Sequence, residues 1–142
     1  MTATNIDDRF ADRPVSTYAT LSKGRVWAGR ILHGLVILFL IMDVVMKLLR
    51  MQPAIDATIR LGFKPDAVFT IGLIGLACLI VYVIPRTTLI GALLWTSYLG
   101  GAVAIQMRAG SSVFETTFPI YVGIVMWLGL WLRDARVNRL LP

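Results

Sequence analysis

The chain has 142 residues, of which 57% are hydrophobic and only 15% are charged, and its formal net charge is +6. Soluble domains carry about 25% charged residues, so this composition excludes an ordinary soluble domain and indicates a single membrane domain. The basic residues flank apolar segments, so they are expected to lie at the membrane surface. Anionic lipid headgroups are therefore a better explanation of the positive charge than nucleic acid.

The N-terminal segment, residues 1–22, is polar and has no apolar core. We therefore expect a flexible cytoplasmic tail rather than a cleavable signal peptide, and we expect the first apolar segment to serve as both targeting signal and anchor. Cys78 is the only cysteine of the sequence. A disulfide within the chain and thiol–disulfide relay chemistry are therefore excluded, because both need paired cysteines.

Four apolar segments approach the roughly 20 residues that a helix needs to cross a bilayer. Short connections join them, which favours antiparallel packing of neighbouring helices. Residues 23–142 are therefore predicted to form one all-α membrane domain, a transmembrane four-helix antiparallel bundle. Its spans are expected at about 27–49, 67–84, 87–107 and 113–132.

The longest connection, between the first and second spans, predicts a short interfacial helix. Pro53 suits a first helical turn and Gly62 suits a helix end. Asp56 and Arg60 have the i,i+4 spacing of an ion pair, and the helix is amphipathic. This helix either only bridges the two spans or also covers a cavity as a lid.

Basic residues are distributed unequally between the two sides of such a bundle. Nine of them lie on the side of both termini and five lie on the other side. The excess of Lys and Arg on the cytoplasmic side of membrane proteins then predicts that both termini are cytoplasmic, beside anionic lipids.

The first span carries two charged residues, Asp43 and Lys47, in an otherwise apolar sequence. They continue a stripe of small and polar residues that runs along one helix face from Gly29 through His33, so this face should point into the bundle. Two interpretations stay open. The residues form an intrahelical ion pair that limits its own desolvation cost, or Asp43 faces a cavity as a proton acceptor or ligand anchor.

Further polar residues are expected at the same non-cytoplasmic depth, where residues 53–62 would cover a polar pocket. Ser97 and Tyr98 in the third span and Glu115 at the start of the fourth are the additional candidate ligand-binding residues. Glu115 also fits a capping box with Ser112, which is a purely structural role. Gln106 lies about half a helical turn from Ser97 and need not face the same interior.

No metal site is predicted, because no cluster of His, Cys or carboxylate residues has the spacing of a haem, zinc or iron–sulfur centre. His33 lies on the stripe of the first span, about 15 Å from the charged pair by the helical rise. It is interpreted as an interfacial or packing histidine.

Several motifs together resemble the DoxX-like family of small bacterial membrane proteins. They are D-x-x-x-K at 43–47, I-P-R-T at 84–87 and Y-L-G-G-A-V-A at 98–104, within a similarity that extends over about residues 25–135. The resemblance implies a four-helix membrane bundle in the bacterial inner membrane. Similar sequences often carry a histidine shortly after the G-G-A-V-A segment, where this chain has Gln106. A glutamine can hydrogen-bond a carbonyl but does not shuttle protons at neutral pH.

The resemblance also implies a function, because the wider family takes its name from a membrane subunit associated with thiosulfate:quinone oxidoreduction. The first hypothesis is a redox-associated accessory subunit that binds a quinone or similar amphipathic ligand, with electrons supplied by a partner or by a bound cofactor. The alternatives are a non-catalytic assembly protein that docks other membrane helices, and an oligomeric proton-coupled transporter. Enzymatic activity, a membrane protein partner and homo-oligomerisation all stay open at this point.

Overall fold

The computed structural model describes residues 22–134 and 137, and this part of the chain contains five α-helices and no strand. The all-α prediction is therefore confirmed. The predicted tail, residues 1–22, lies outside the described residues except for Ser22. The helices are α2 (Lys23–Leu48), α3 (Gln52–Arg60), α4 (Ala67–Val83), α5 (Thr88–Arg108) and α6 (Val113–Arg133).

Local sequence signals account for where these helices begin and end. Ser22 caps α2 by accepting a hydrogen bond from the backbone N–H of Arg25, and Ser112 caps α6 in the same way through Glu115. Pro53 stands in the first turn of α3, and Gly62 follows this helix with a φ of 85°, a left-handed conformation that glycine adopts without strain.

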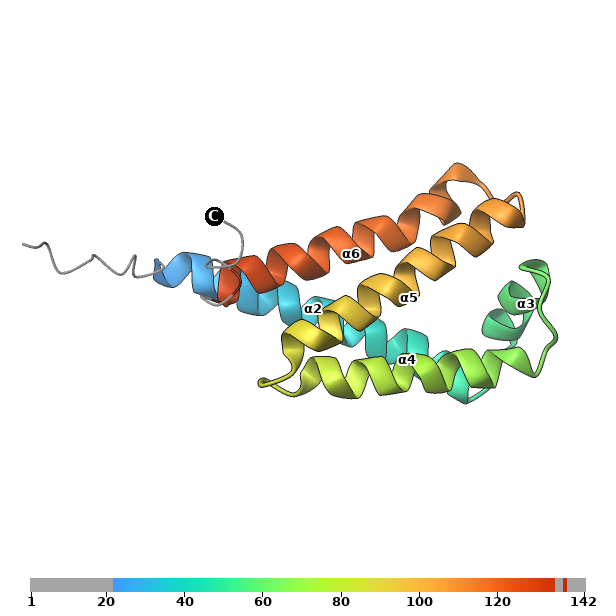
Figure 1. The fold of residues 1–142 in the computed structure, drawn as a ribbon, viewed down its shortest axis with the longest axis horizontal. Helices are drawn as coiled ribbons and strands as arrows, with labels where there is room; N and C mark the ends of the chain where they lie inside the picture. The colour runs from blue at the N-terminus through green and yellow to red at the C-terminus, as the bar shows by residue number, and fades with distance from the viewer. Residues whose placement is uncertain (1–21, 135–136, 138–142) are drawn as a thin grey trace, which may run out of the picture.

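The four long helices form a closed ring of neighbours (Figure 1). Helix α2 packs against α4 and α6, and α5 packs against the same two helices from the opposite side. The short helix α3 packs against α2 and α4, reaches α6 through the Arg60 side chain, and lies across one end of the ring (Figure 1). The centre of the ring at that end is therefore bordered by all five helices.

Large buried side chains fill the middle of the ring. Leu40 of α2, Tyr82 of α4, Trp95 of α5 and Met126 of α6 are all at most 1% exposed. Gly91 allows the closest approach between helices, since a Cβ atom there would lie only 2.3 Å from the Cα of Tyr82. Helices α4 and α5 are thus held together by backbone contact as well as by side chains.

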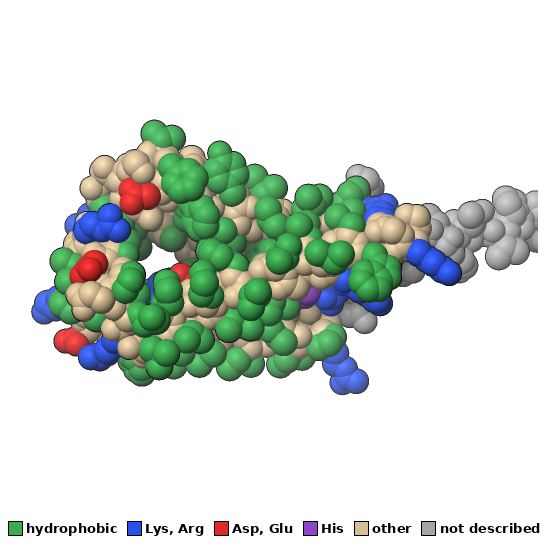
Figure 2. Space-filling model, turned by 180° about the vertical axis from the view of Figure 1, so that it is seen from behind, with side chains coloured by type: hydrophobic (Ala, Val, Ile, Leu, Met, Phe, Trp, Pro, Cys, Tyr) green, Lys and Arg blue, Asp and Glu red, His purple; other side chains and the backbone are tan. Residues whose placement is uncertain are grey.

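The outer surface of the helices is apolar, with hydrophobic side chains along the flanks and most charges at the ends (Figure 2). Leu38, Leu73 and Ile124 are each more than half exposed. Such a surface suits hydrocarbon rather than water. Helices α2, α5 and α6 are long and apolar enough to cross a membrane, whereas α4 is more apolar than these three but has only 17 residues.

Candidate functional site

A cavity of about 520 Å³ lies inside the ring at the end covered by α3. Its walls are mostly apolar, with side chains such as Phe39, Ile71, Phe118 and Val122. Figure 2 shows an opening into the molecule near this end. A volume of this size and composition is typical of a site for a small amphipathic molecule.

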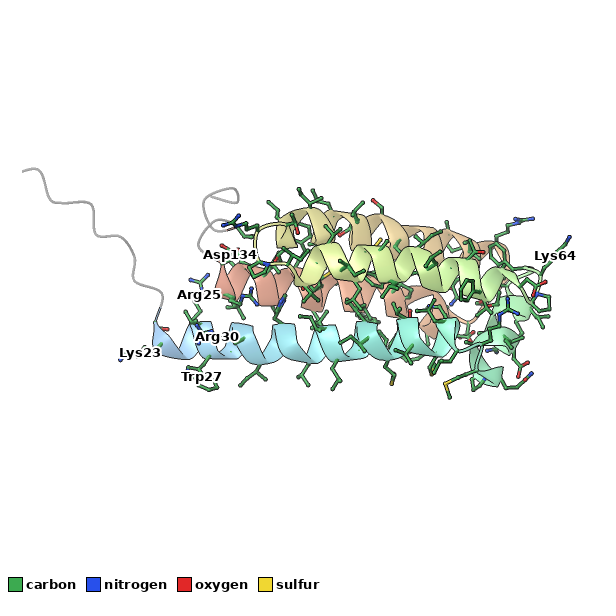
Figure 3. The ribbon with its side chains drawn as sticks, turned by 90° about the horizontal axis from the view of Figure 1, so that it is seen from below. Lys23, Arg25, Trp27, Arg30, Lys64 and Asp134 are labelled. Carbon is green, nitrogen blue, oxygen red and sulfur yellow. The ribbon has the colours of Figure 1, made fainter. Side chains whose placement is uncertain are left out.

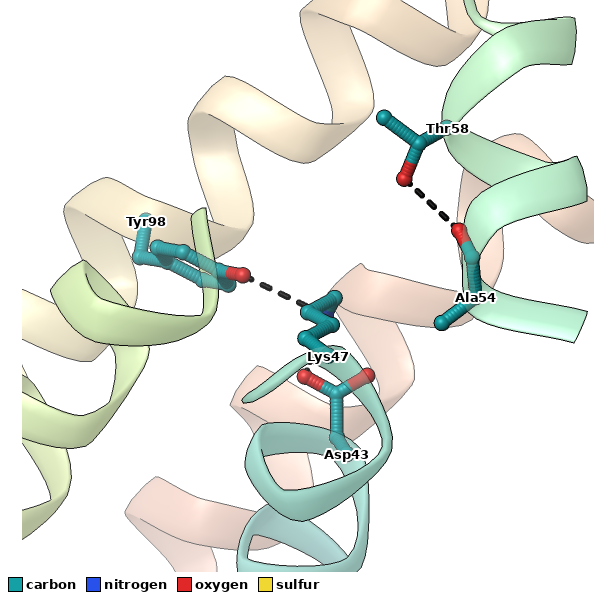
Figure 4. Close-up of polar contacts among 5 residues, drawn as sticks. All are labelled: Asp43, Lys47, Ala54, Thr58 and Tyr98. Carbon is teal, nitrogen blue, oxygen red and sulfur yellow. Dashed lines mark hydrogen bonds and ion pairs between the residues drawn. The ribbon is translucent and has the colours of Figure 1, made fainter. Parts of the chain in front are cut away.

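The polar corner of the cavity is formed by α2 and α5. The Lys47 ammonium group donates a hydrogen bond to the Asp43 carboxylate, and its Nζ atom lies 3.3 Å from the hydroxyl oxygen of Tyr98 (Figure 4). The side chains of Lys47 and Asp43 are only 21% and 29% exposed. The corner therefore concentrates two opposite charges and a phenol in a largely apolar wall.

Helix packing positions this corner. The predicted stripe of α2 is buried at Gly29, His33, Val36 and Leu40, and Asp43 and Lys47 continue it to the cavity. The absence of a side chain at Gly72 brings α4 against the backbone of Lys47, where a Cβ would lie 2.9 Å from the Cβ of the lysine. The corner is thus supported from behind by closely packed backbone.

Tyr98 is oriented by a neighbour on its own helix. The rings of Tyr98 and Trp95 meet edge to face with centroids 5.0 Å apart, and Trp95 is only 1% exposed. The hydroxyl of Tyr98 is thereby directed toward Lys47, across the gap between α5 and α2 (Figure 4). Its oxygen accepts from Lys47, which leaves its own hydrogen available to a ligand.

Helix α3 covers the cavity with a mostly apolar face. Pro53, Ala54, Ala57 and Leu61 border the cavity, together with Thr58. The Thr58 hydroxyl donates to the carbonyl of Ala54 at 2.7 Å, so it is directed to its own helix (Figure 4). Helix α3 therefore closes one side of the cavity and offers few hydrogen bonds to a ligand inside it.

Ser97 and Gln106 also border the cavity. The Ser97 hydroxyl donates to the carbonyl of Leu93 at 3.2 Å. From its position about half a helical turn from Ser97, Gln106 need not face the same interior. The structure places both residues at the cavity, which is wide enough to include them. The spacing that predicts this placement is Tyr98–Ala102–Gln106, since residues four apart share a helix face.

Glu115 lies apart from the other four candidate residues and does not border the cavity. Its carboxylate accepts from the backbone N–H and the hydroxyl of Ser112 at 3.1 and 2.9 Å, which completes the capping box. Its second oxygen lies 3.7 Å from Arg60 of α3. The structure thus brings together Asp43, Lys47, Ser97 and Tyr98 and places Glu115 at the rim.

The predicted ion pair within α3 is wrong. Asp56 accepts a hydrogen bond from Gln52 at 3.0 Å, and Arg60 reaches across to Glu115 instead. Because the side chains of the latter pair are 71% and 42% exposed, the contact is a surface ion pair. It is the only ion pair between α3 and α6 among the described residues.

His33 lies at a distance from the cavity and does not border it. Its Nδ1 atom is hydrogen-bonded to the hydroxyl of Tyr82 inside the bundle. Within residues 22–134 and 137, no group of three or more His, Cys, Asp or Glu residues could hold a metal ion. The side chains that border the cavity offer hydrogen bonds and a pair of opposite charges.

Comparison with known proteins identifies one match, to the model of the DoxX-like family over residues 31–129. The matched region begins in α2 and ends in α6, so it contains every residue of the cavity. The chain matches no curated protein and no solved structure.

Proposed function

Since the chain belongs to the DoxX-like family and is a small membrane protein, we propose that it is a redox-associated accessory subunit that holds a neutral amphipathic molecule, such as a quinone, in the cavity under α3. The ring of the ligand would occupy the polar corner. Its apolar remainder would lie against the hydrophobic wall.

The observation that carries this proposal is the neutralised lysine in the polar corner. Lys47 and the hydroxyl of Tyr98 supply hydrogen-bond donors, which suit the carbonyl oxygens of a quinone. Asp43 cancels the charge of Lys47, so the corner is formally neutral. An anionic headgroup would be repelled by the Asp43 carboxylate, and the corner has no net positive charge to offset this repulsion. A neutral ligand is therefore favoured.

In the proposed topology, α2, α4, α5 and α6 all cross the membrane as an antiparallel four-helix bundle. The 17 residues of α4 span about 26 Å, close to the roughly 30 Å of the hydrocarbon core. Helix α3 would lie in the interface on the non-cytoplasmic side. Both termini would be cytoplasmic, beside anionic lipids of the bacterial inner membrane.

The electrons of a quinone reaction would come from a protein partner. The cavity residues can hold, orient and hydrogen-bond a quinone, but Asp, Lys, Tyr, Ser and Gln side chains do not supply the two electrons that reduce it to a quinol. The proposed contribution of this chain is therefore to bind the quinone and to shield it from water.

Ligand analysis of protein purified in a mild detergent tests the proposal. Mass spectrometry of an organic extract is expected to find a quinone at near one per chain in the wild type and strongly depleted in the Asp43→Ala and Tyr98→Phe variants. Asp56→Ala is the matched control, because it removes the same charge from the exposed side of α3. A quinone retained by both cavity variants would reject the site.

The same purification distinguishes the quinone-binding subunit from the alternative function, a non-catalytic assembly protein. A stoichiometric protein partner together with a ligand-free cavity would favour a non-catalytic assembly protein. Thermal unfolding of each variant in detergent shows whether ligand loss reflects the site or the loss of the fold.

A further inference from the structure

A second concave site lies on the outside of the ring, between α5 and α6. It is a groove of about 570 Å³, separate from the central cavity although Leu99 and Pro119 border both. Thr96 is its polar side chain, and this hydroxyl is already engaged, since it accepts from the indole N–H of Trp127 at 2.9 Å and donates to the carbonyl of Ala92 at 2.8 Å. The groove therefore offers an apolar surface and no free hydrogen-bonding side chain.

Two glycines keep the groove open without serving the packing of the fold. A Cβ at Gly100 would meet nothing within 4 Å, and one at Gly123 would meet only Leu99, at 3.7 Å. Gly91 is different, because a Cβ there collides with α4. The volume in front of Gly100 and Gly123 is thus available to another molecule.

The length of the groove matches one leaflet of a bilayer. It follows α6 from Pro119 to Trp131, which at the helical rise is about 18 Å. Half of a typical hydrocarbon core is about 15 Å. An extended acyl chain from the lipid leaflet at the α2 N-terminus would therefore fill the groove along its length.

The Trp131 end of the groove carries positive charge. The Arg25 guanidinium carbon lies 4.2 Å from the centroid of the Trp131 ring, and Arg25 extends from α2 toward α6 whereas Trp27 points away (Figure 3). Among the described residues, this end of the ring holds one acid, Asp134, against five basic residues: Lys23, Arg25, Arg30, Arg86 and Arg133.

The opposite end of the ring is nearly balanced. It holds four acids against five basic residues, and three of the acids, Asp43, Asp66 and Glu115, form ion pairs with Lys47, Arg50 and Arg60 respectively. Figure 2 accordingly shows mixed basic and acidic side chains there, and basic side chains beside the grey segment at the other end. An anion is therefore attracted to the Trp131 end of the groove.

We propose that the groove between α5 and α6 binds an anionic glycerophospholipid, with one acyl chain over Gly100 and Gly123 and the phosphate at Arg25. A second copy of the chain packed side by side in the same direction is disfavoured, because it would bring two positive ends together. The inference rests on the proposed membrane insertion and is independent of the quinone in the central cavity.

Native mass spectrometry of the full chain tests this site. The protein is reconstituted in vesicles of equal parts palmitoyl-oleoyl phosphatidylglycerol and phosphatidylcholine, extracted in mild detergent, and its retained lipids are counted. Preferential retention of phosphatidylglycerol is expected. Arg25→Gln should lower the preference about fivefold because it removes the cation placed at the phosphate, and this is the size of the contribution that one basic residue makes to binding an anionic lipid. Arg25→Lys should keep most of it.

Two further variants make the outcome specific. Arg86→Gln is the matched control, because it removes one positive charge from the same end without touching the groove, and it should leave the preference unchanged. The double variant Gly100→Leu/Gly123→Leu should fold and lose the bound lipid, since its side chains fill open space.

Three results would overturn the proposal: equal retention of both lipids, retention unaffected by the leucine pair, or a dimer in the native spectrum that the leucine pair abolishes. The quinone content of the same samples is measured in parallel. Quinone present without bound phosphatidylglycerol rejects this inference alone, whereas bound phosphatidylglycerol without quinone rejects only the central-cavity proposal.

Discussion

The Nδ1 atom of His33 and the hydroxyl oxygen of Tyr82 lie 2.9 Å apart and join α2 to α4 inside the bundle. Both residues are buried, at 6% and 0% exposure, and their rings are 5.0 Å apart at the centroids. Each side chain thus satisfies a polar atom of the other in an apolar environment. His33 serves as a packing histidine whose polar partner comes from a different helix.

Removing one partner of this hydrogen bond should destabilise the fold. Tyr82→Phe keeps the ring in place and leaves the His33 nitrogen without its partner, at an expected cost of about 1 kcal/mol for a hydrogen bond between membrane helices. A lower midpoint of unfolding in a detergent titration would be the result. Tyr121→Phe is the control, because that tyrosine is 56% exposed. Identical midpoints for the two variants would contradict a stabilising role.

The glycines of α5 should differ sharply in their tolerance of a methyl group. Gly91→Ala places its Cβ 2.3 Å from the Cα of Tyr82, so α4 and α5 must separate, at an expected cost of about 1–3 kcal/mol. Gly100→Ala meets nothing within 4 Å and should be neutral or slightly stabilising. The yield of monodisperse protein and the thermal midpoint compare the two. Equal behaviour would contradict the close approach of α4 and α5.

Asp43 and Lys47 should show coupled effects on stability. Asp43→Asn leaves the lysine charge without its counterion in a partly buried site, and Lys47→Met does the same to the carboxylate. The double variant removes both charges and should be more stable than the sum of the single effects predicts, with a coupling energy of about 1–2 kcal/mol. A double-mutant cycle on unfolding measures it, and additive effects would show that the two charges act independently.

The ion pair between Arg60 and Glu115 should control access to the cavity more than it controls stability. A surface pair of this kind stabilises a fold by at most about 1 kcal/mol, yet it is the described polar link between α3 and α6. Glu115→Gln removes the charge while a glutamine can still complete the capping box. The variant should unfold at nearly the wild-type temperature, with faster hydrogen exchange in α3.

Labelling of a cysteine in the cavity gives a second measurement of access. In a Cys78→Ala background, Ser97→Cys should react faster with a maleimide when Glu115→Gln is also present. Asp56→Asn is the control, because this acid makes no contact with Arg60 in the structure. Labelling rates that do not depend on Glu115 would show that α3 is held by its contacts with α2 and α4 alone.

Features encoded within one helix could be predicted from the sequence. The stripe of α2 from Gly29 to Leu40 follows the helical period, and the structure buries it. The capping box of Ser112 and Glu115 depends on residues three apart and is present. Local periodicity and capping chemistry determine these features, so no knowledge of distant contacts is needed.

Features that depend on contacts between helices could not be predicted. Arg60 forms its ion pair with Glu115 rather than with Asp56, because the end of α3 lies near the start of α6. The spacing of residues within one helix cannot predict which helices lie near each other. The spacing of Gln106 from Tyr98 places it on the face of that tyrosine, but only the width of the space between five helices brings the opposite face, with Ser97, to the same cavity. The partner of His33 is 49 residues away in sequence, and only the packing of α2 on α4 brings them together.

The charges on the two sides of the bundle bear on how the protein would be inserted into the membrane. In the proposed orientation, residues 49–66 must be carried across the bilayer during synthesis, and they contain three basic and two acidic residues, a net charge of only +1. The N-terminal segment, residues 1–25, holds four basic and three acidic residues, which is the same net charge of +1, and stays on the cytoplasmic side. Because orientation follows the number of Lys and Arg residues rather than the net charge, the nine basic residues on the side of the termini, against five on the α3 side, would set the direction of insertion.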